Sequence, residues 1–475
     1  MSTAATSVVC VDFGSTFTKA ALVDLATGDL LASTSHPTTL PDAAGDGDVL
    51  DGYDACMSAL TEQDPRAAEA DVLACSSAGG GLRIAVVGNE ELVTAEAGRR
   101  VALSSGGKVV LVLHGGLDPD KLAALRQAEP DVVLLVGGTD GGNAEVLEGD
   151  AAFLSAAPWA GPVVVAGNVD SQPLVADLLA ESQTPYVLAD NVVPRIGVLA
   201  PDSARRAIRE IFLSHVIGGK HLSIRTDARG RAFTELVRGA TPDVVLTGVE
   251  LLARGLDDEH PGAGDVVVVD VGGATTDVHS VVELDPETGS VDGAGLSREV
   301  VGVTPVTRTV EGDLGMRWSA ISTVEAAGRD DLHAAAVRRR EQPDFLPDDA
   351  HERDADLEIA AAAVRIALER HAGRSKVVVS PEGRVVERSG KDLREVDLLV
   401  GSGGVLRHGG PDAVRRVLLP ATGDAFEGGW QLPRDPEVVV DRDYVLAAAG
   451  LLAEEHPLAA HRLVRRLATA GDRLP

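Results

Sequence analysis

Apolar and polar positions along this chain are arranged in blocks that predict alternating strands and helices. Between residues 108 and 189, short runs rich in valine and leucine are separated by segments of about twelve residues whose apolar positions have helical spacing. We predict strands over Lys108–His114, Asp131–Val136, Pro162–Ala166 and Tyr186–Ala189. Strands that alternate with helices in this way are typical of a parallel α/β sheet.

Another apolar run, near the N-terminus, ends in a cluster of polar residues. Val8–Val11 predicts a buried strand that ends at Asp12. A turn rich in glycine and hydroxyl residues can point successive N–H groups at phosphate oxygens, and a carboxylate at the strand end can hold hydrated Mg²⁺. The candidate residues are Asp12, Gly14, Ser15, Thr16 and Lys19. Taken alone, this stretch also fits an ordinary β-hairpin.

The same pattern returns in the second half of the chain. Asp265–Asp270 is another apolar strand that ends in an aspartate. The residues that follow it and are candidates for phosphate binding are Gly272, Gly273, Thr275 and Thr276. Two such hairpins predict two related lobes that hold a polyphosphate and its Mg²⁺ from both sides, which is more specific than either turn alone.

A third glycine-rich turn follows the predicted strand Asp397–Val400. It contains Gly401, Ser402, Gly403 and Gly404. Glycines let the backbone approach a flat ligand closely, so this turn is a candidate adenosine site. A tight strand-to-helix turn without a ligand fits the same residues equally well.

The sequence also predicts the structure of two further loops and two longer segments. Gly137–Asn143 follows a predicted parallel strand, where ligands of α/β sheets bind, although a plain strand-to-helix turn is the favoured alternative. Glu311–Gly315 carries two carboxylates, and a solvated turn is favoured over a metal site. We expect a third strand of the second lobe over Ser290–Thr304 and mostly helix over Ala200–Gly239.

The composition narrows the classes of function. The formal net charge of −30 disfavours nucleic-acid and anionic-membrane partners, whose phosphates attract a basic face. No apolar run approaches the roughly 20 residues of a membrane span, and Met1–Ser7 has no basic segment typical of a signal peptide. The three cysteines, Cys10, Cys56 and Cys75, are scattered, which indicates neither a disulfide framework nor a zinc site. We therefore expect a cytoplasmic protein.

The three glycine-rich turns together resemble the ASKHA superfamily, which includes actin, heat-shock chaperone ATPases, sugar kinases and acetate kinase. Asp12–Lys19 matches its first phosphate motif, Asp270–Thr276 its second, and Leu398–Val405 its adenosine motif. The resemblance implies an α/β fold of the actin-like ATPase (ribonuclease H-like) type, with two lobes and an inserted parallel α/β domain.

This resemblance also implies a division of the chain into four segments. The first ATPase lobe would cover residues 1–80 and the inserted α/β domain residues 81–200. A helical connection would cover residues 201–262. The second lobe, with the adenosine motif and a return to the first lobe, would cover residues 263–475.

More narrowly, the chain resembles the glutamate mutase accessory proteins called MutL or GlmL, which are unrelated to the mismatch-repair protein of the first name. The stretches that carry this resemblance are Asp12–Lys19, Ser76–Leu82, Gly137–Asn143, Asn191–Gly197 and Glu311–Gly315. The resemblance implies an ATP-dependent accessory role beside an adenosylcobalamin-dependent mutase. It also implies similarity to reactivating chaperones, which use ATP to make an inactivated mutase release damaged cobalamin.

Each candidate residue takes a role under this hypothesis. Asp12 and Asp270 would hold Mg²⁺ through waters, and one of them would orient the attacking water. The two phosphate turns would contact the β- and γ-phosphates of ATP, and the third turn would border the adenosine. Positioning and charge neutralisation supply most of the catalysis of phosphoryl transfer.

Two other functions fit the same scaffold, because fold does not determine function. A small-molecule kinase would need an acceptor pocket with a base near the γ-phosphate, and the sequence does not identify one. A non-enzymatic nucleotide-dependent scaffold would need binding alone. Both aspartates and Lys19 are present, which favours hydrolysis over binding alone.

Overall fold

The computed structural model describes residues 6–41, 47–157, 159–283, 304–380, 383–423 and 429–469. The described chain forms two compact units. Of the described residues, unit 1 contains those up to Gly248, Thr304 and Ala447–Ala460. Unit 2 contains those from Val249 to Glu283, Pro305–Leu446 and those from His461 on. Helices α9 (Thr241–Arg254), α15 (Val445–Leu452) and α16 (Pro457–Thr469) continue from one unit into the other.

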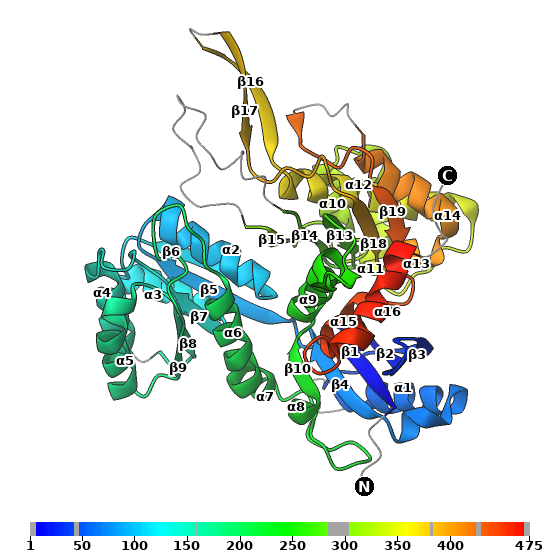
Figure 1. The fold of residues 1–475 in the computed structure, drawn as a ribbon, viewed down its shortest axis with the longest axis horizontal. Helices are drawn as coiled ribbons and strands as arrows, with labels where there is room; N and C mark the ends of the chain where they lie inside the picture. Colours follow the sequence, from blue (N-terminus) through cyan, green and yellow to red (C-terminus); the bar gives the residue numbers. More distant parts are fainter. Residues whose placement is uncertain are drawn as a thin grey trace. The chain divides into compact units, whose positions relative to one another are not determined.

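Unit 1 contains a five-stranded mixed sheet with the order β10-β4-β1-β2-β3 (Figure 1). Its strands are β1 (Ser7–Phe13), β2 (Phe17–Asp24), β3 (Leu30–Pro37), β4 (Asp71–Ser76) and β10 (Val237–Ala240). β1 is antiparallel to β2 and parallel to β4. Helix α1 (Val49–Gln63) packs on this sheet, and it begins with a capping box in which the side chains of Asp48 and Asp51 accept each other's backbone N–H groups.

Unit 1 also contains a second sheet, in which all five strands are parallel. Its order is β6-β5-β7-β8-β9. The strands are β5 (Leu82–Gly88), β6 (Gly107–His114), β7 (Val132–Leu135), β8 (Val163–Val165) and β9 (Tyr186–Leu188). Relative to the chain this is the order 2-1-3-4-5 of a doubly wound sheet, whose direction of growth reverses between β5 and β7.

Helices cover both faces of this parallel sheet (Figure 1). Along β5, Ile84 and Val86 face one core while Ala85 and Val87 face the other, as the two-residue period of a strand requires. The first core includes α2 (Glu96–Ser104) and α6 (Asp202–Ile211). The second core includes α3 (Pro119–Gln127), α4 (Glu145–Ala156) and α5 (Gln172–Glu181).

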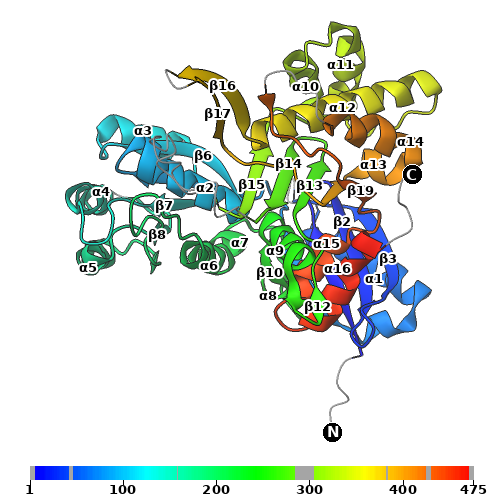
Figure 2. The same cartoon turned by 45° about the horizontal axis from the view of Figure 1, so that its top comes forward.

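Unit 2 contains the third sheet, with the order β15-β14-β13-β18-β19. Its strands are β13 (Val266–Val271), β14 (Thr276–Val281), β15 (Val306–Glu311), β18 (Leu398–Ser402) and β19 (Glu437–Val440). Helix α12 (Ala350–His371) packs on it, and α10 (Ala320–Ala326) and α11 (His333–Glu341) pack against α12 (Figure 2). β13 is antiparallel to β14 and parallel to β18, so this sheet repeats the arrangement of the first sheet of unit 1.

The predicted α/β fold of the actin-like type, with an inserted parallel domain, is confirmed by these sheets. Two local expectations need correction. The third strand of the second lobe is β15, whereas Ser290–Thr304, except for its last residue, lies outside the described residues. The segment Ala200–Gly239 is helical from Asp202 to Gly219, but residues 220–232 contain no helix and the last residues form β10, which pairs with β4. The division into four segments stays a prediction.

The smaller elements connect these layers. The remaining α-helices of the described ranges are α7 (Ile217–Gly219), α8 (Phe233–Leu236), α13 (Gly404–His408) and α14 (Gly410–Ala413). The remaining strands form two hairpins, β11 (Gly255–Asp257) with β12 (His260–Pro261) and β16 (Arg374–Ser380) with β17 (Gly383–Ser389). No helix in the described ranges has the length and apolar character of a membrane span.

Candidate functional site

The first predicted phosphate turn joins β1 to β2. The N–H of Gly14 donates to the Phe17 carbonyl oxygen over 3.1 Å, and the Thr38 hydroxyl donates to the Gly14 carbonyl oxygen over 2.9 Å. A side chain at Gly14 would place its Cβ 2.5 Å from the Phe17 oxygen, so the turn requires glycine here. Ser15 and Thr16 are exposed at its tip. Hydrogen bonds to Phe17 and Thr38 therefore hold the turn, and Ser15 and Thr16 face solvent.

Asp12 lies at the end of β1 and is almost fully buried. The Thr241 hydroxyl donates to its Oδ1 over 2.6 Å, and the Cys75 thiol contacts the same oxygen at 3.7 Å. Lys19 pairs with Asp12 across the β1–β2 ladder and places its Nζ 3.6 Å from Oδ2. One carboxylate oxygen is thus held by unit 1 itself, while the other lies beside a cation.

Cys75 lies beneath this carboxylate on β4. Burial raises the pKa of the Cys75 thiol well above its usual range, and the charge of Asp12 acts in the same direction. The thiol therefore stays protonated and neutral, which makes it a weak donor to Asp12 instead of a competing anion.

The second predicted phosphate turn joins β13 to β14 in unit 2. Its Gly272 N–H donates to the Thr275 carbonyl oxygen over 2.9 Å, as Gly14 does in the first turn. The N–H groups of Met316 and Arg317 donate to the carbonyl oxygens of Gly272 and Gly273 over 3.0 and 2.8 Å. A separate segment of unit 2 therefore supports this turn from its carbonyl side.

That supporting segment begins in the Glu311–Gly315 motif. A Cβ at Gly315 would lie 2.7 Å from the Ala274 carbonyl carbon, so only glycine lets the motif lie under the turn. The Arg370 guanidinium holds both carboxylates of the motif, at 2.7 Å from Glu311 and from Asp313, and lowers the pKa of the Asp313 carboxyl. An arginine of α12 thus binds both carboxylates, while Gly312 and Asp313 stay exposed to solvent as expected of a solvated turn.

Two threonines of the second turn differ in exposure. The Thr275 hydroxyl donates to the Asp277 carboxylate over 3.2 Å, and this carboxylate also binds Arg308. The Thr276 side chain is fully buried and donates its proton to the Leu314 carbonyl oxygen over 3.1 Å. Its hydroxyl therefore has a structural role, and only the backbone of Thr276 is kept as a candidate for phosphate binding.

The third turn follows β18, the neighbour of β13. Asp270 and Ser402 are register partners, so the two strands end side by side. Gly401 packs against the side chains of Leu406 and Leu418, where a Cβ would lie 2.7 Å from Leu418. Gly403 has a positive φ. Gly404 is the first residue of α13, and a Cβ added there would have no atom within 4 Å. Unit 2 therefore brings the second predicted phosphate turn and the turn predicted to bind adenosine to one edge of one sheet.

Asp441 is a buried carboxylate at this edge that the sequence analysis did not identify. It follows β19, its N–H donates to the Gly401 carbonyl oxygen over 2.9 Å, and its carboxylate accepts the N–H groups of Val445 and Leu446. Burial raises the pKa of the Asp441 carboxyl to about 6 despite these donors, and the charges of Asp443 and Asp270 add to the rise.

The structure therefore gathers the predicted residues into two sets. Unit 1 holds Asp12, Gly14, Ser15, Thr16 and Lys19 around the first turn. Unit 2 holds the others around two neighbouring strand ends; they are Asp270, Gly272, Gly273, Thr275, Thr276, Gly401, Ser402, Gly403 and Gly404. Their roles in binding ATP and Mg²⁺ stay predictions. No group of three or more histidine, cysteine or acidic side chains suited to a metal occurs in the described part of the chain.

Sequence reasoning missed three neighbours of these turns. Thr241 could not be found, because it is remote from Asp12 in the sequence. Trp318, which lies against Gly273, has no local signal either. Asp441 did have one, because the apolar run Val438–Val440 ends in an aspartate just as the strands before Asp12 and Asp270 do.

Two sheets of the same strand order, each with an aspartate at the end of its central strand and a glycine turn after it, define an actin-like α/β protein. The family model described as MutL protein matches residues 8–467. A Protein MutL from Clostridium tetanomorphum is 35% identical over 469 residues, which cover 96% of this chain and 98% of that protein. The chain belongs to the MutL family.

Solved structures resemble this chain more distantly. A nucleotide-free acetone carboxylase matches 94% of this chain and 70% of its own, with 15% identity and a TM-score of 0.40. A gluconate kinase from Lactobacillus acidophilus matches 98% of this chain and 89% of its own, with 14% identity and a TM-score of 0.31. Both TM-scores lie below 0.5, so the family assignment rests on the sequence matches.

Proposed function

We propose that this protein binds Mg-ATP through its glycine turns and hydrolyses it as an accessory protein of an adenosylcobalamin-dependent mutase of the glutamate mutase type. ATP would supply the energy for release of inactive cobalamin from that mutase. Membership of the MutL family supports the accessory role. The repeated strand–aspartate–glycine-turn arrangement is the observation that supports nucleotide chemistry.

In this proposal Asp12 and Asp270 would hold hydrated Mg²⁺, which would neutralise charge on the phosphates, and one of the two carboxylates would orient the attacking water. Hydrated Mg²⁺ suits carboxylates at strand ends, since it keeps several of its own waters. Asp12 fits because Thr241 and Cys75 fix Oδ1 and leave Oδ2 beside Lys19. Lys19, Ser15 and Thr16 would bind the β- and γ-phosphates, together with the backbone of Gly272, Gly273, Thr275 and Thr276.

The adenosine would lie at the turn after β18. The free space at Gly404 suits a flat ring that approaches the backbone, whereas a side chain there would keep it away. Gly401 and Gly403 would act indirectly, because their missing side chains let β18, α13 and β13 pack closely enough to form the turn. The Ser402 side chain is buried, so Ser402 would contribute to adenosine binding mainly through its backbone.

The test replaces each aspartate by its isosteric amide. In Asp12→Asn and Asp270→Asn, we expect Mg-ATP turnover to fall by at least about a hundredfold, because the hydrated metal loses a negatively charged partner that would hold it beside the transferred phosphate. Thermal unfolding should show that both variants stay folded. Asp71→Asn is the matched control, since Asp71 is an exposed aspartate at the start of β4, and it should keep full turnover. Full turnover in both site variants would overturn the assignment.

A further inference from the structure

The parallel sheet of unit 1 has a distinctive carboxyl edge. All five strands run in the same direction, so the loops that follow them leave from one edge. We call the loops at residues 89–95, 115–118, 136–144, 166–171 and 189–200 the carboxyl edge. It contains Gly137–Asn143 and Asn191–Gly197, two of the family-like stretches that the proposed nucleotide site does not use.

Hydrogen bonds join these loops to one another. The side-chain amide of Asn191 donates to the Gly138 carbonyl oxygen over 3.0 Å and to the Asp140 carboxylate over 2.8 Å. The same carboxylate accepts the N–H of Val169 over 3.2 Å, and the N–H of Asp140 donates to the Pro194 carbonyl oxygen. Three successive loops are therefore held in one arrangement. Because they are already ordered, binding a partner would cost less conformational entropy.

Large apolar side chains are exposed at this edge. Of the thirteen such side chains among the described residues, six lie here or within one turn of it; they are Leu92, Val169, Leu174, Leu188, Ile196 and Val198. Ile196 is 75% exposed and Leu92 is 70% exposed. Clustering of this kind on a water-facing edge is typical of a surface that another molecule covers.

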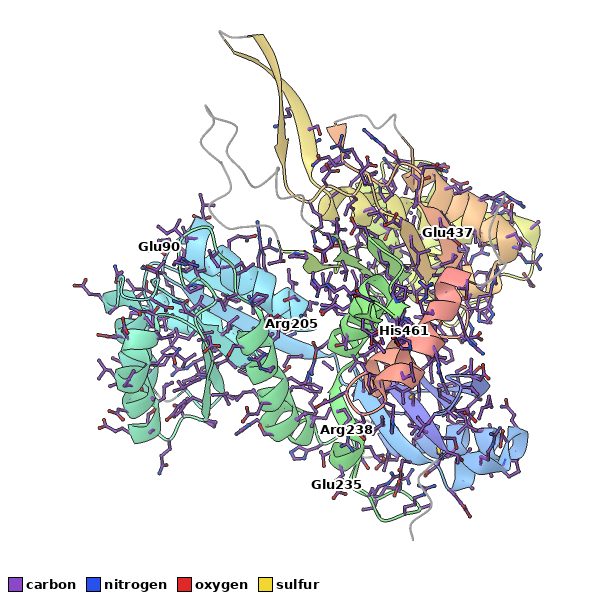
Figure 3. The ribbon with its side chains drawn as sticks, viewed as in Figure 1. Glu90, Arg205, Glu235, Arg238, Glu437 and His461 are labelled. Carbon is purple, nitrogen blue, oxygen red and sulfur yellow. The ribbon has the colours of Figure 1, made fainter. Side chains whose placement is uncertain are left out.

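The charged residues of the carboxyl edge are almost all acidic. The exposed acids within these loops are Glu90, Glu91, Asp118, Asp140, Asp170 and Asp190, and Arg195 is the single lysine or arginine within them. Within one turn beyond the loops lie Arg99, which pairs with Glu96, and Lys121, which pairs with Asp118. Figure 3 labels Glu90, in the loop that follows β5. Acids at this density repel nucleic acid and anionic lipid, and they also repel a second copy of the same edge. A protein face with an apolar centre and a rim of lysine and arginine is complementary to them.

We propose that the carboxyl edge is a docking surface for such a protein face, with Ile196 and Leu92 as apolar anchors and the acids as the steering rim. This rests on the proposed function, under which the partner is the mutase. Apolar anchors supply most of the affinity of such an interface, whereas rim charges mainly set the rate of association and its salt dependence.

The experiment measures binding of the full-length protein to the purified mutase by surface plasmon resonance, with ATP turnover as the control for folding. Ile196→Asp and Leu92→Asp should each raise Kd by at least about tenfold, with basal ATP turnover unchanged. Ile224→Asp is the matched control, because Ile224 is 94% exposed in unit 1 but outside the carboxyl edge, and its Kd should stay within about twofold of the wild type.

A second pair of variants tests the rim. Glu91→Lys and Asp190→Lys should slow association and flatten its dependence on salt, while dissociation changes little. Unchanged Kd in both apolar variants, with the wild type binding the mutase, would overturn the docking surface and leave the proposed function standing. A wild type that does not bind the mutase would overturn the proposed function itself. Loss of self-association in Ile196→Asp, seen by sedimentation, would assign the edge to a second copy and also overturn the proposal.

Discussion

Gly403 and Gly404 are neighbours in the sequence, but the structure uses them differently. Gly403 has φ +108° and ψ 159°, a region that side chains exclude, and a Cβ there would lie 2.3 Å from the Val271 carbonyl oxygen. Gly404 begins α13, and a Cβ there would meet no atom within 4 Å. The first glycine lets the ends of β13 and β18 meet, whereas the second leaves space beside them.

This difference predicts opposite effects of one methyl group. Gly403→Ala should lower the free energy of unfolding by at least about 1–3 kcal/mol, because it adds both backbone strain and a clash. Gly404→Ala should leave stability unchanged or raise it by about 0.5–1 kcal/mol, because alanine is the better helix residue. Urea denaturation followed by circular dichroism compares the two. Equal destabilisation by both substitutions would contradict the assigned roles.

At the scale of elements, Asp150 ties α4 to the loop that precedes α3. Its Oδ1 accepts the Leu117 N–H over 2.5 Å, while its buried Oδ2 has no hydrogen-bond partner among the described residues. Burial raises the pKa of the Asp150 carboxyl to about 6, because it outweighs the Leu117 hydrogen bond and the charge of Lys121. The folded protein therefore keeps this proton to a higher pH than the unfolded chain.

The sign of the pH dependence follows from linkage. The unfolded chain releases the proton near pH 4 and the folded protein near pH 6, so the contribution of Asp150 is fully present below pH 4 and is lost as pH rises through 6. The free energy of unfolding falls by about 3 kcal/mol over this range, because the pKa of Asp150 is raised by roughly two units. Asp150→Asn should match the wild type near pH 4 and exceed it in stability at pH 7. Thermal unfolding of both proteins across this range is the measurement, and a variant less stable than the wild type at pH 7 would contradict it.

The elements that the sequence revealed are those with a local signal. The apolar runs before Asp12 and Asp270 predicted β1 and β13, and the alternation between residues 108 and 189 predicted four of the five strands of the parallel sheet. β5 was not predicted, although Ile84–Val87 is an apolar run. β10 was missed, because Val237–Ala240 has no strand period and becomes a strand only through pairing with β4. The support of Asp12 by Thr241 and of the second turn by Gly315 arises from tertiary packing, which no local pattern encodes.

At the scale of the whole molecule, one strand arrangement occurs in both units. The order β10-β4-β1-β2-β3 in unit 1 corresponds to the order β19-β18-β13-β14-β15 in unit 2. The central strands, β1 and β13, each end beside an aspartate. In unit 1 a doubly wound parallel sheet is inserted after β4, and its carboxyl edge is apolar and acidic. We propose that the repeated sheets bind the nucleotide and that the inserted sheet docks the partner.

The most direct test of this account is cofactor release from the mutase. The mutase is loaded with inactive cobalamin and mixed with this protein, and free cobalamin and ATP turnover are measured together. We predict release only with Mg-ATP and the wild-type protein, and none with a non-hydrolysable ATP analogue or with Asp12→Asn. ATP turnover that rises with a small metabolite in the absence of the mutase, without any release of cobalamin, would contradict the account and indicate a kinase.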